Sequence, residues 1–254
     1  MTFDRESLRA LFGCIDHTSL NATDTPSTIE RFCGETLQMT SKVGVSVAAV
    51  CVYPTLVSAA VRMMQGSGIA VASVACGFPS GQMPFNLKLD EVKYVLEAGA
   101  DEVDMVISRG AVIEGEMTQV YDEVTAVREL CEGKKLKVIL ETGELKSEEN
   151  IEKASLVALS AGADFIKTST GKIPVGATVE AAEIMLKILT KESQNLKKLV
   201  GFKASGGIST VEEAMEYVEL AKKYIGKQNI NNQRFRIGAS RLTTKVYQLL
   251  EEKN

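Results

Sequence analysis

GADFIKTSTGK (residues 162–172) places an apolar run directly before a lysine and then continues with a hydroxylated segment that ends in Gly-Lys. Short apolar runs are typical of buried strands in parallel sheets, so we predict a strand over residues 165–167 that opens on a functional site. Side chains alternate along a strand, so Lys167 shares a face with Phe165 while Ile166 points toward a covering helix.

Lys167 admits two interpretations. An ammonium in partly apolar surroundings loses hydration, which lowers its pKa and makes the neutral, nucleophilic amine accessible. Such an amine can attack a carbonyl and form a Schiff base. Alternatively, the stem of Lys167 lies on apolar surface with its head in water, or the ammonium pairs with a carboxylate.

Composition sets the size and the class of the protein. With 254 residues, of which 45% are hydrophobic and 24% charged, the chain is long enough for a full core. One barrel or two small domains fit this length, but no linker or low-complexity tract interrupts it, so we predict one domain over residues 1–254. The net charge of -4 argues against nucleic acid or an anionic membrane as the main partner.

The five cysteines are scattered without CxxC spacing, as expected of reduced thiols in a cytoplasmic protein. The first residues carry acidic side chains and no long apolar stretch, so neither a signal peptide nor a membrane span is predicted. With His17 as the single histidine, the chain lacks the ligands of a zinc site, and we expect no metal and no cofactor.

Apolar segments and amphipathic segments alternate along the whole chain. The expected strands span residues 14–18, 47–52, 69–75, 102–107, 137–141, 165–167, 200–203 and 236–238. After a short helix at residues 4–11, the expected helices span residues 25–39, 54–65, 85–97, 117–131, 147–161, 179–189, 210–224 and 240–251. Eight strands, each followed by a helix, predict a (β/α)8 TIM barrel, with a doubly wound open sheet as the rival fold.

A weak internal repeat favours the barrel. VLEAGADEVDMVI (residues 95–107) and VALSAGADFIKTS (residues 157–169) each combine a helix end, an AGAD turn and a strand. Gly99 and Gly162 suit the residue that follows a helix, where a left-handed backbone is common.

Polar residues at the carboxyl ends of barrel strands form the active sites of such enzymes. The expected strands supply Asp16, Asp104, Glu141, Lys167, Lys203 and the segment 238–240. Lys167 and Lys203 end neighbouring strands, which lie about 4.8 Å apart, so one ammonium can depress the pKa of the other. Either lysine can instead be held as a cation by Asp16, Asp104 or Glu141, and both statements can hold together.

Asp104 faces the same way as Glu102, into the barrel, and beside lysines it is a candidate proton carrier. Its structural alternative is a buried ion pair that fixes the geometry of a lysine.

Three glycine-containing segments follow the last three strands, at residues 169–172, 205–207 and 238–241. Glycines let backbone N–H groups approach an oxyanion, and a helix that begins near Ser240 presents its positive end there. Lys172 and Arg241 add charge. These segments predict a phosphate site.

Eight motifs together resemble the deoxyribose-phosphate aldolases, a family of class I aldolases. They are DHTSL (16–20), VCVYP (50–54), GFPSG (77–81), GADEVDMVI (99–107), KVILETGEL (137–145), GADFIKTSTGK (162–172), VGFKASGGI (200–208) and RIGASRL (236–242).

The resemblance implies reversible cleavage of 2-deoxy-D-ribose 5-phosphate to D-glyceraldehyde 3-phosphate and acetaldehyde, without a metal. It implies that Lys167 forms the Schiff base, that Lys203 tunes it, and that Asp104 relays protons. It also implies phosphate contacts at Gly171, Lys172, Gly206, Gly207, Gly238 and Ser240. Some members have serine where Arg241 stands and end in tyrosine, whereas this chain ends in EEKN.

Two other functions remain open at this point. Another Schiff-base barrel, such as a transaldolase-like enzyme, would use a different donor. A non-catalytic barrel would bind a sugar phosphate without turnover, but it would need no reactive amine. We expect a homodimer.

Overall fold

Eight parallel strands form a closed barrel in the computed structural model, which describes residues 3–196 and 198–253. The strands pair in sequence order, and β8 pairs with β1 to close the sheet. They are β1 (Ile15–Thr18), β2 (Ala49–Val52), β3 (Ala70–Ala75), β4 (Glu102–Val106), β5 (Lys135–Ile139), β6 (Phe165–Lys167), β7 (Gly201–Ser205) and β8 (Phe235–Ala239). This arrangement confirms the predicted (β/α)8 barrel and rules out the open sheet.

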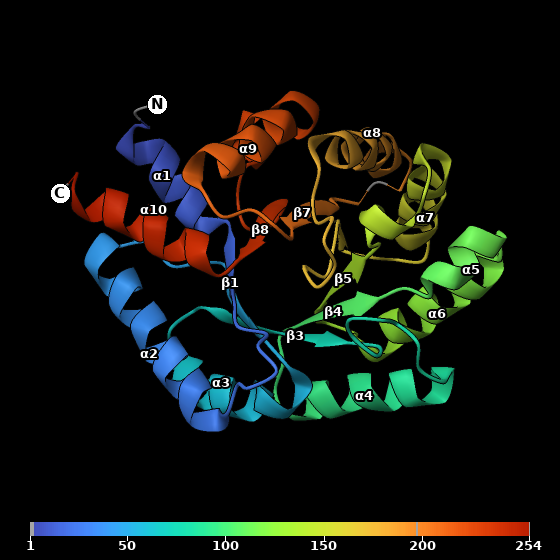
Figure 1. Ribbon diagram of the computed structural model, residues 1–254, viewed down its shortest axis with the longest axis horizontal. Coiled ribbons are helices and arrows are strands. Elements are labelled where there is room, and N and C mark those ends of the chain that lie inside the picture. Colours follow the sequence, from blue (N-terminus) through green and yellow to red (C-terminus); the bar gives the residue numbers. More distant parts are fainter. Residues whose placement is uncertain (1–2, 197, 254) are drawn as a thin grey trace.

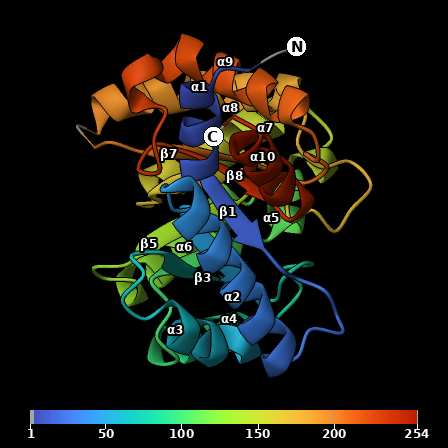
Figure 2. The ribbon, with the colours of Figure 1, turned by 90° about the vertical axis from the view of Figure 1, so that its left-hand side faces the viewer.

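Helices surround the strands as an outer ring (Figure 1). They are α1 (Arg5–Gly13), α2 (Pro26–Val43), α3 (Val57–Met64), α4 (Phe85–Glu97), α5 (Arg109–Glu114), α6 (Met117–Leu130), α7 (Glu148–Ser160), α8 (Val179–Asn195), α9 (Val211–Ile225) and α10 (Arg241–Glu251), with 3-10 turns at Pro54–Leu56, Thr142–Glu144 and Lys227–Asn229. The extra helix α1 packs against α10, which also contacts α2, so the first and last units of the chain meet on one side (Figures 1 and 2).

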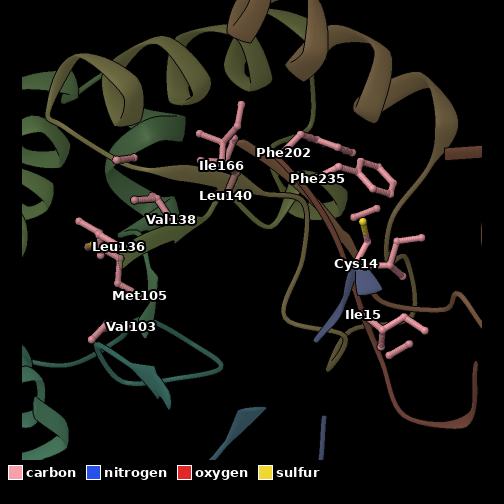
Figure 3. Close-up of a cluster of buried hydrophobic side chains, with 14 of the residues drawn as sticks. Cys14, Ile15, Val103, Met105, Leu136, Val138, Leu140, Ile166, Phe202 and Phe235 are labelled. Atoms are coloured by element: carbon pink, nitrogen blue, oxygen red, sulfur yellow. The ribbon is translucent and has the colours of Figure 1, made fainter. Parts of the chain in front are cut away.

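The main hydrophobic core lies between the strands and the helices (Figure 3). Ile166 on β6 and Phe202 on β7 are fully buried there. Their strand neighbours Lys167 and Lys203 point the opposite way, into the barrel, because side chains alternate along a strand. The alternation therefore separates an apolar layer outside the sheet from an interior that holds the charged side chains beside a smaller apolar cluster from β2 and β3.

Several helices begin at capping residues or end at glycines, as the sequence predicts. Thr25 caps α2 and Thr210 caps α9, each accepting a hydrogen bond from the backbone N–H three residues ahead. Gly99 and Gly162 follow α4 and α7 with φ of 100° and 97°. Any residue with a Cβ would be strained in this conformation.

Several predicted boundaries were wrong. β5 begins two residues earlier than expected and ends at Ile139, so Glu141 lies beyond the strand. β7 continues to Ser205, so Lys203 occupies the middle of its strand and not the end. Helices α2 and α8 extend four and six residues beyond their expected ends, and α5 was not predicted.

Among residues 3–196 and 198–253, no helix has the length and apolar character needed to cross a membrane.

Candidate active site

Seven charged side chains from six strands meet inside the barrel. We call them the ion cluster: Asp16, Glu102, Asp104, Lys137, Lys167, Lys203 and Arg236. Each is at most 3% exposed. Charged groups are almost never this buried unless they are paired, so a dense cluster of this kind needs a specific explanation.

Lys167, Lys203 and Asp104 form the centre of the ion cluster. Lys167 and Lys203 are register partners on neighbouring strands. Both amines donate to one oxygen, Asp104 Oδ2, over 2.8 Å from Lys167 and 2.7 Å from Lys203. The structure thus brings together the three residues that the sequence nominated for catalysis.

The two lysines differ in their other partners. Lys203 also donates to Asp16 Oδ2 over 2.5 Å, whereas the only ion-pair partner of Lys167 in the described chain is Asp104. Burial lowers the pKa of Lys167, and the Lys203 cation adds to this effect against the attraction of Asp104. Burial also acts on Lys203, but Asp104 and Asp16 outweigh it and raise the pKa of that lysine.

These shifts have opposite directions in the two lysines. Lys203 is held as a cation, and Lys167 is the amine that more readily becomes neutral. The sequence suggested both loss of hydration and a neighbouring ammonium as causes of a lowered pKa at Lys167, and burial is the larger of the two.

Asp104 and Asp16 are both held in the ionised form by the cations around them. Burial alone would raise the pKa of Asp104, but Lys137, Lys167 and Lys203 together hold it well below its usual range. Arg236, Lys203 and Lys137 lower the pKa of Asp16 in the same way.

Lys137 and Arg236 complete the ion cluster, and the sequence interpretation missed both. Lys137 Nζ lies 2.6 Å from Asp104 Oδ1 and 2.7 Å from Glu102 Oε2. Arg236 binds Asp16 and places its Nη2 2.9 Å from Glu102 Oε1. Strand alternation is the signal that could have found them. Each lies two residues from an interior-facing position of an apolar strand, so its side chain also faces the barrel interior.

A cavity of about 410 Å³ opens above the ion cluster at the carboxyl ends of β1, β6, β7 and β8. Lys167 lines this cavity, whereas Asp104 and Lys203 lie behind it. All six residues expected at the phosphate line the cavity: Gly171, Lys172, Gly206, Gly207, Gly238 and Ser240. One space therefore joins the reactive amine to the expected anion loops.

Two glycines make this packing possible. A Cβ on Gly238 would lie 3.0 Å from Lys203 Cε and 2.9 Å from Ser205 Cβ, so the missing side chain leaves room for Lys203. Gly206 has φ of 93° and lies against the backbone of Gly171 and Gly176, where a Cβ would come within 3.0 Å of Gly176. The loops after β6 and β7 are thus held in direct backbone contact.

Two cations stand at the rim of the cavity. Lys172 Nζ donates to the carbonyl oxygen of Leu20, so this lysine joins the loop after β6 to the loop after β1. Arg241 is the first residue of α10 and is exposed. The first turn of α10 and these two side chains provide the positive charge that an anion requires.

Glu141 lies apart from the lysines with which the sequence grouped it. Its fully buried carboxylate accepts from the backbone N–H and the hydroxyl of Thr170, and Arg109 Nη1 lies 3.3 Å away. Burial raises the pKa of Glu141. Its backbone is left-handed, with φ of 58°. Glu141 therefore holds the loop after β6 and does not contact Lys167 or Lys203.

A second cavity, of about 560 Å³, lies at the opposite ends of β5 and β6. Three of its charged groups are bound to one another, since Arg128 and Lys198 lie 2.6 Å and 2.8 Å from Asp164. It contains no residue of the ion cluster, so we place the active site in the smaller cavity. Within the described residues, no group of three or more His, Cys, Asp or Glu side chains is arranged to hold a metal ion.

Comparison with known proteins gives a consistent relationship. The model of the DeoC/LacD family of aldolases matches residues 11–241. The deoxyribose-phosphate aldolase of Mus musculus is 43% identical over 245 residues, which cover 91% of this chain and 77% of the mouse protein. The Homo sapiens enzyme of that name is 40% identical over the same shares.

A solved structure shows the same relationship. The tetrameric deoxyribose phosphate aldolase of Aeropyrum pernix superposes with a TM-score of 0.77 at 27% identity, covering 98% of this chain and 94% of that one. The family match spans the barrel from before β1 to the start of α10. The chain belongs to the DeoC/LacD family of aldolases.

Proposed function

We propose that this aldolase reversibly cleaves 2-deoxy-D-ribose 5-phosphate to D-glyceraldehyde 3-phosphate and acetaldehyde through a Schiff base on Lys167. The observation that carries the proposal is the position of Lys167, whose lowered pKa and single ion-pair partner accompany direct access to the cavity. The relatives named above are called deoxyribose-phosphate aldolases, which supports this choice of substrate.

The reaction begins when the neutral amine of Lys167 adds to the aldehyde carbon of the sugar phosphate. Loss of water from the resulting carbinolamine gives an iminium ion, which withdraws electrons from the neighbouring carbon. The bond between the second and third carbons then breaks as the hydroxyl on the third carbon loses its proton and becomes the aldehyde of the first product. The enamine left on Lys167 takes up a proton, and hydrolysis of the imine releases acetaldehyde.

Lys203 and Asp104 transfer the protons in these steps. The pKa of Asp104 is held low, so the resting proton resides on Lys203 and Asp104 acts as the acceptor that joins the two amines. Lys167 Nζ and Lys203 Nζ lie 2.8 Å and 2.7 Å from the same oxygen, Asp104 Oδ2. These contacts allow a proton to pass toward the departing hydroxyl of the carbinolamine.

The glycine-containing loops bind the phosphate in this proposal. Gly171, Gly206, Gly207 and the first turn of α10 offer backbone N–H groups, while Lys172 and Arg241 offer charge. Phosphate binding at the rim fixes the sugar so that its aldehyde reaches Lys167, and this orientation lowers the barrier to the chemical step.

The test combines a product assay with covalent trapping. We expect the wild-type enzyme to release glyceraldehyde 3-phosphate from the deoxy sugar, measured by a coupled assay in the presence of a chelator. Acetaldehyde and borohydride should add mass at Lys167 alone, read by peptide mass spectrometry. Lys167→Leu should lose at least about 10³-fold in turnover and keep its circular dichroism spectrum.

Two results would contradict the proposal. Label found on Lys203 would move the Schiff base to the other lysine. Transfer of a dihydroxyacetone unit in place of acetaldehyde would make the enzyme a transaldolase-like protein.

The remaining parts of the proposal concern organisation and location. We propose that residues 1–254 form one domain, since the first strand pairs with the last. We also propose a homodimer, to be measured by light scattering, and a cytoplasmic location. The free state of all five cysteines supports a reducing compartment.

A further inference from the structure

The charges of the ion cluster balance only if Lys167 is neutral. Three carboxylates, Asp16, Glu102 and Asp104, are buried with three cations that contact at least two of them each. Lys137 contacts all three carboxylates, Lys203 contacts Asp16 and Asp104, and Arg236 contacts Asp16 and Glu102.

Lys167 is the fourth basic group, and among residues 3–196 and 198–253 it has no carboxylate of its own. Its one acidic contact, Asp104 Oδ2, is shared with Lys203. Protonation of Lys167 would therefore add a net positive charge to a region where every charged side chain is at most 3% exposed. An uncompensated charge in such surroundings is costly, so the neutral amine is favoured.

Three members of the ion cluster are remote from the substrate cavity. Glu102, Lys137 and Arg236 do not line it. Arg236 points toward the other end of the barrel, where its Nε donates to the carbonyl oxygen of Asn232 over 2.6 Å and its guanidinium lies 5.5 Å from the centre of the Phe165 ring. These three side chains can influence the reaction only through their charges and through the groups they hold.

We propose that Glu102, Lys137 and Arg236 are positioning residues whose balanced charges set the protonation state of Lys167. This inference rests on the proposed Schiff-base function of Lys167. It assigns a role in catalysis to the part of the barrel interior that lies behind the reacting groups.

The titratable side chains that share the barrel interior with Lys167 come from almost every strand. They are Asp16 on β1, Cys51 on β2, Glu102 and Asp104 on β4, Lys137 on β5, Lys203 on β7 and Arg236 on β8, while β3 has no titratable side chain. A neutral substitution at Glu102, Lys137 or Arg236 changes the net charge of these groups by one and leaves the residues that line the cavity unchanged.

The experiment measures the initial rate at which acetaldehyde and cyanoborohydride label Lys167 as a function of pH. Glu102→Gln removes a negative charge, so the midpoint of the acid limb should fall by about one pH unit. Arg236→Gln removes a positive charge, so the midpoint should rise by a similar amount. Lys137→Met should also raise it and replaces Arg236→Gln if that variant does not fold.

Two controls separate charge from packing. The double variant Glu102→Gln with Arg236→Gln restores the balance and should return the midpoint to the wild-type value. Arg236→Lys keeps the charge but loses the guanidinium that contacts Asp16 and Glu102 together. The midpoint of its acid limb should stay within about 0.3 pH units of wild type. Circular dichroism selects the variants that are folded.

Opposite shifts with restoration in the double variant support the inference. Unchanged midpoints, or shifts of the same sign in Glu102→Gln and Arg236→Gln, would overturn it while leaving the Schiff base intact. If the wild-type enzyme shows no label on Lys167 at any pH, the proposed function itself fails.

Discussion

Gly238 shows how one absent side chain shapes the active site. Lys203 is fixed by Asp16 and Asp104, and its Cε passes the Cα of Gly238 closely enough that a Cβ there would lie only 3.0 Å away. We expect Gly238→Ala to displace Lys203 and to lower kcat by roughly 10- to 100-fold, since small displacements of a catalytic group have effects of this size. Steady-state kinetics measure the change.

Gly110→Ala is the matched control for this prediction. A Cβ at Gly110 meets nothing within 4 Å, and its φ lies outside the left-handed region. Its kcat should stay within about two-fold of wild type. Equal losses in the two variants would show that the close approach at Gly238 is unimportant.

Lys137 and Arg236 illustrate which residues sequence patterns do not reveal. Lys167 and Lys203 were identified because each follows an apolar run. Lys137 and Arg236 instead stand before apolar residues, where a charged side chain looks like the polar boundary of a strand. Their partners lie 33 and 220 residues away in the chain, and no local pattern predicts those contacts.

At the scale of elements, the strand and helix pattern was predictable because each apolar run or amphipathic stretch has its own period. The ends of β5 and β7 were not, because they depend on neighbours. Lys135 belongs to β5 although it is charged, because it pairs with Glu102 on β4, and Ser205 belongs to β7, where it pairs with Gly238 on β8. Pairing in the sheet overrides the local preference in both cases.

The loop after β6 depends on a buried carboxylate. Glu141 accepts from the Thr170 hydroxyl over 2.5 Å, and that hydroxyl in turn accepts from the backbone N–H of Lys172. We expect Glu141→Gln to loosen this loop and to raise KM for the phosphorylated substrate about ten-fold, with a smaller change in kcat. A KM for deoxyribose without phosphate should change less.

Glu144→Gln provides the comparison. Glu144 also pairs with Arg109, over 2.7 Å, but it is about half exposed and makes no hydrogen bond to Thr170. Its KM should remain close to wild type. A similar increase in both variants would assign the effect to Arg109 and not to Thr170.

At the scale of the whole molecule, the single histidine ties stability to pH. Burial between β1 and α2 lowers the pKa of His17 to about 4, against a usual value of 6.5. Between pH 6.5 and pH 4, the imidazole is therefore protonated in the unfolded chain but neutral in the folded protein. The free energy of unfolding falls as the pH decreases through this range. The difference corresponds to about 3 kcal/mol of unfolding free energy at pH 4 relative to pH 7.

Urea unfolding of the wild type and of His17→Gln between pH 7 and pH 4.5 measures this contribution. The variant has no histidine, so its stability should vary less with pH by most of that amount. Parallel curves for the two proteins would show that the imidazole is not the group that titrates. Asp16 and Asp104 do not affect the comparison, because both proteins contain them and their lowered pKa values place their protonation at lower pH.

The arrangement in which Lys167 alone reaches the cavity from the ion cluster has a practical consequence for enzyme engineering. Selectivity for a new aldehyde can be sought by randomising the mouth of the cavity, at Leu20 or Ser209, while the ion cluster beneath stays unchanged. Libraries built at those sites would retain carbon–carbon bond formation and vary only in which acceptor they admit.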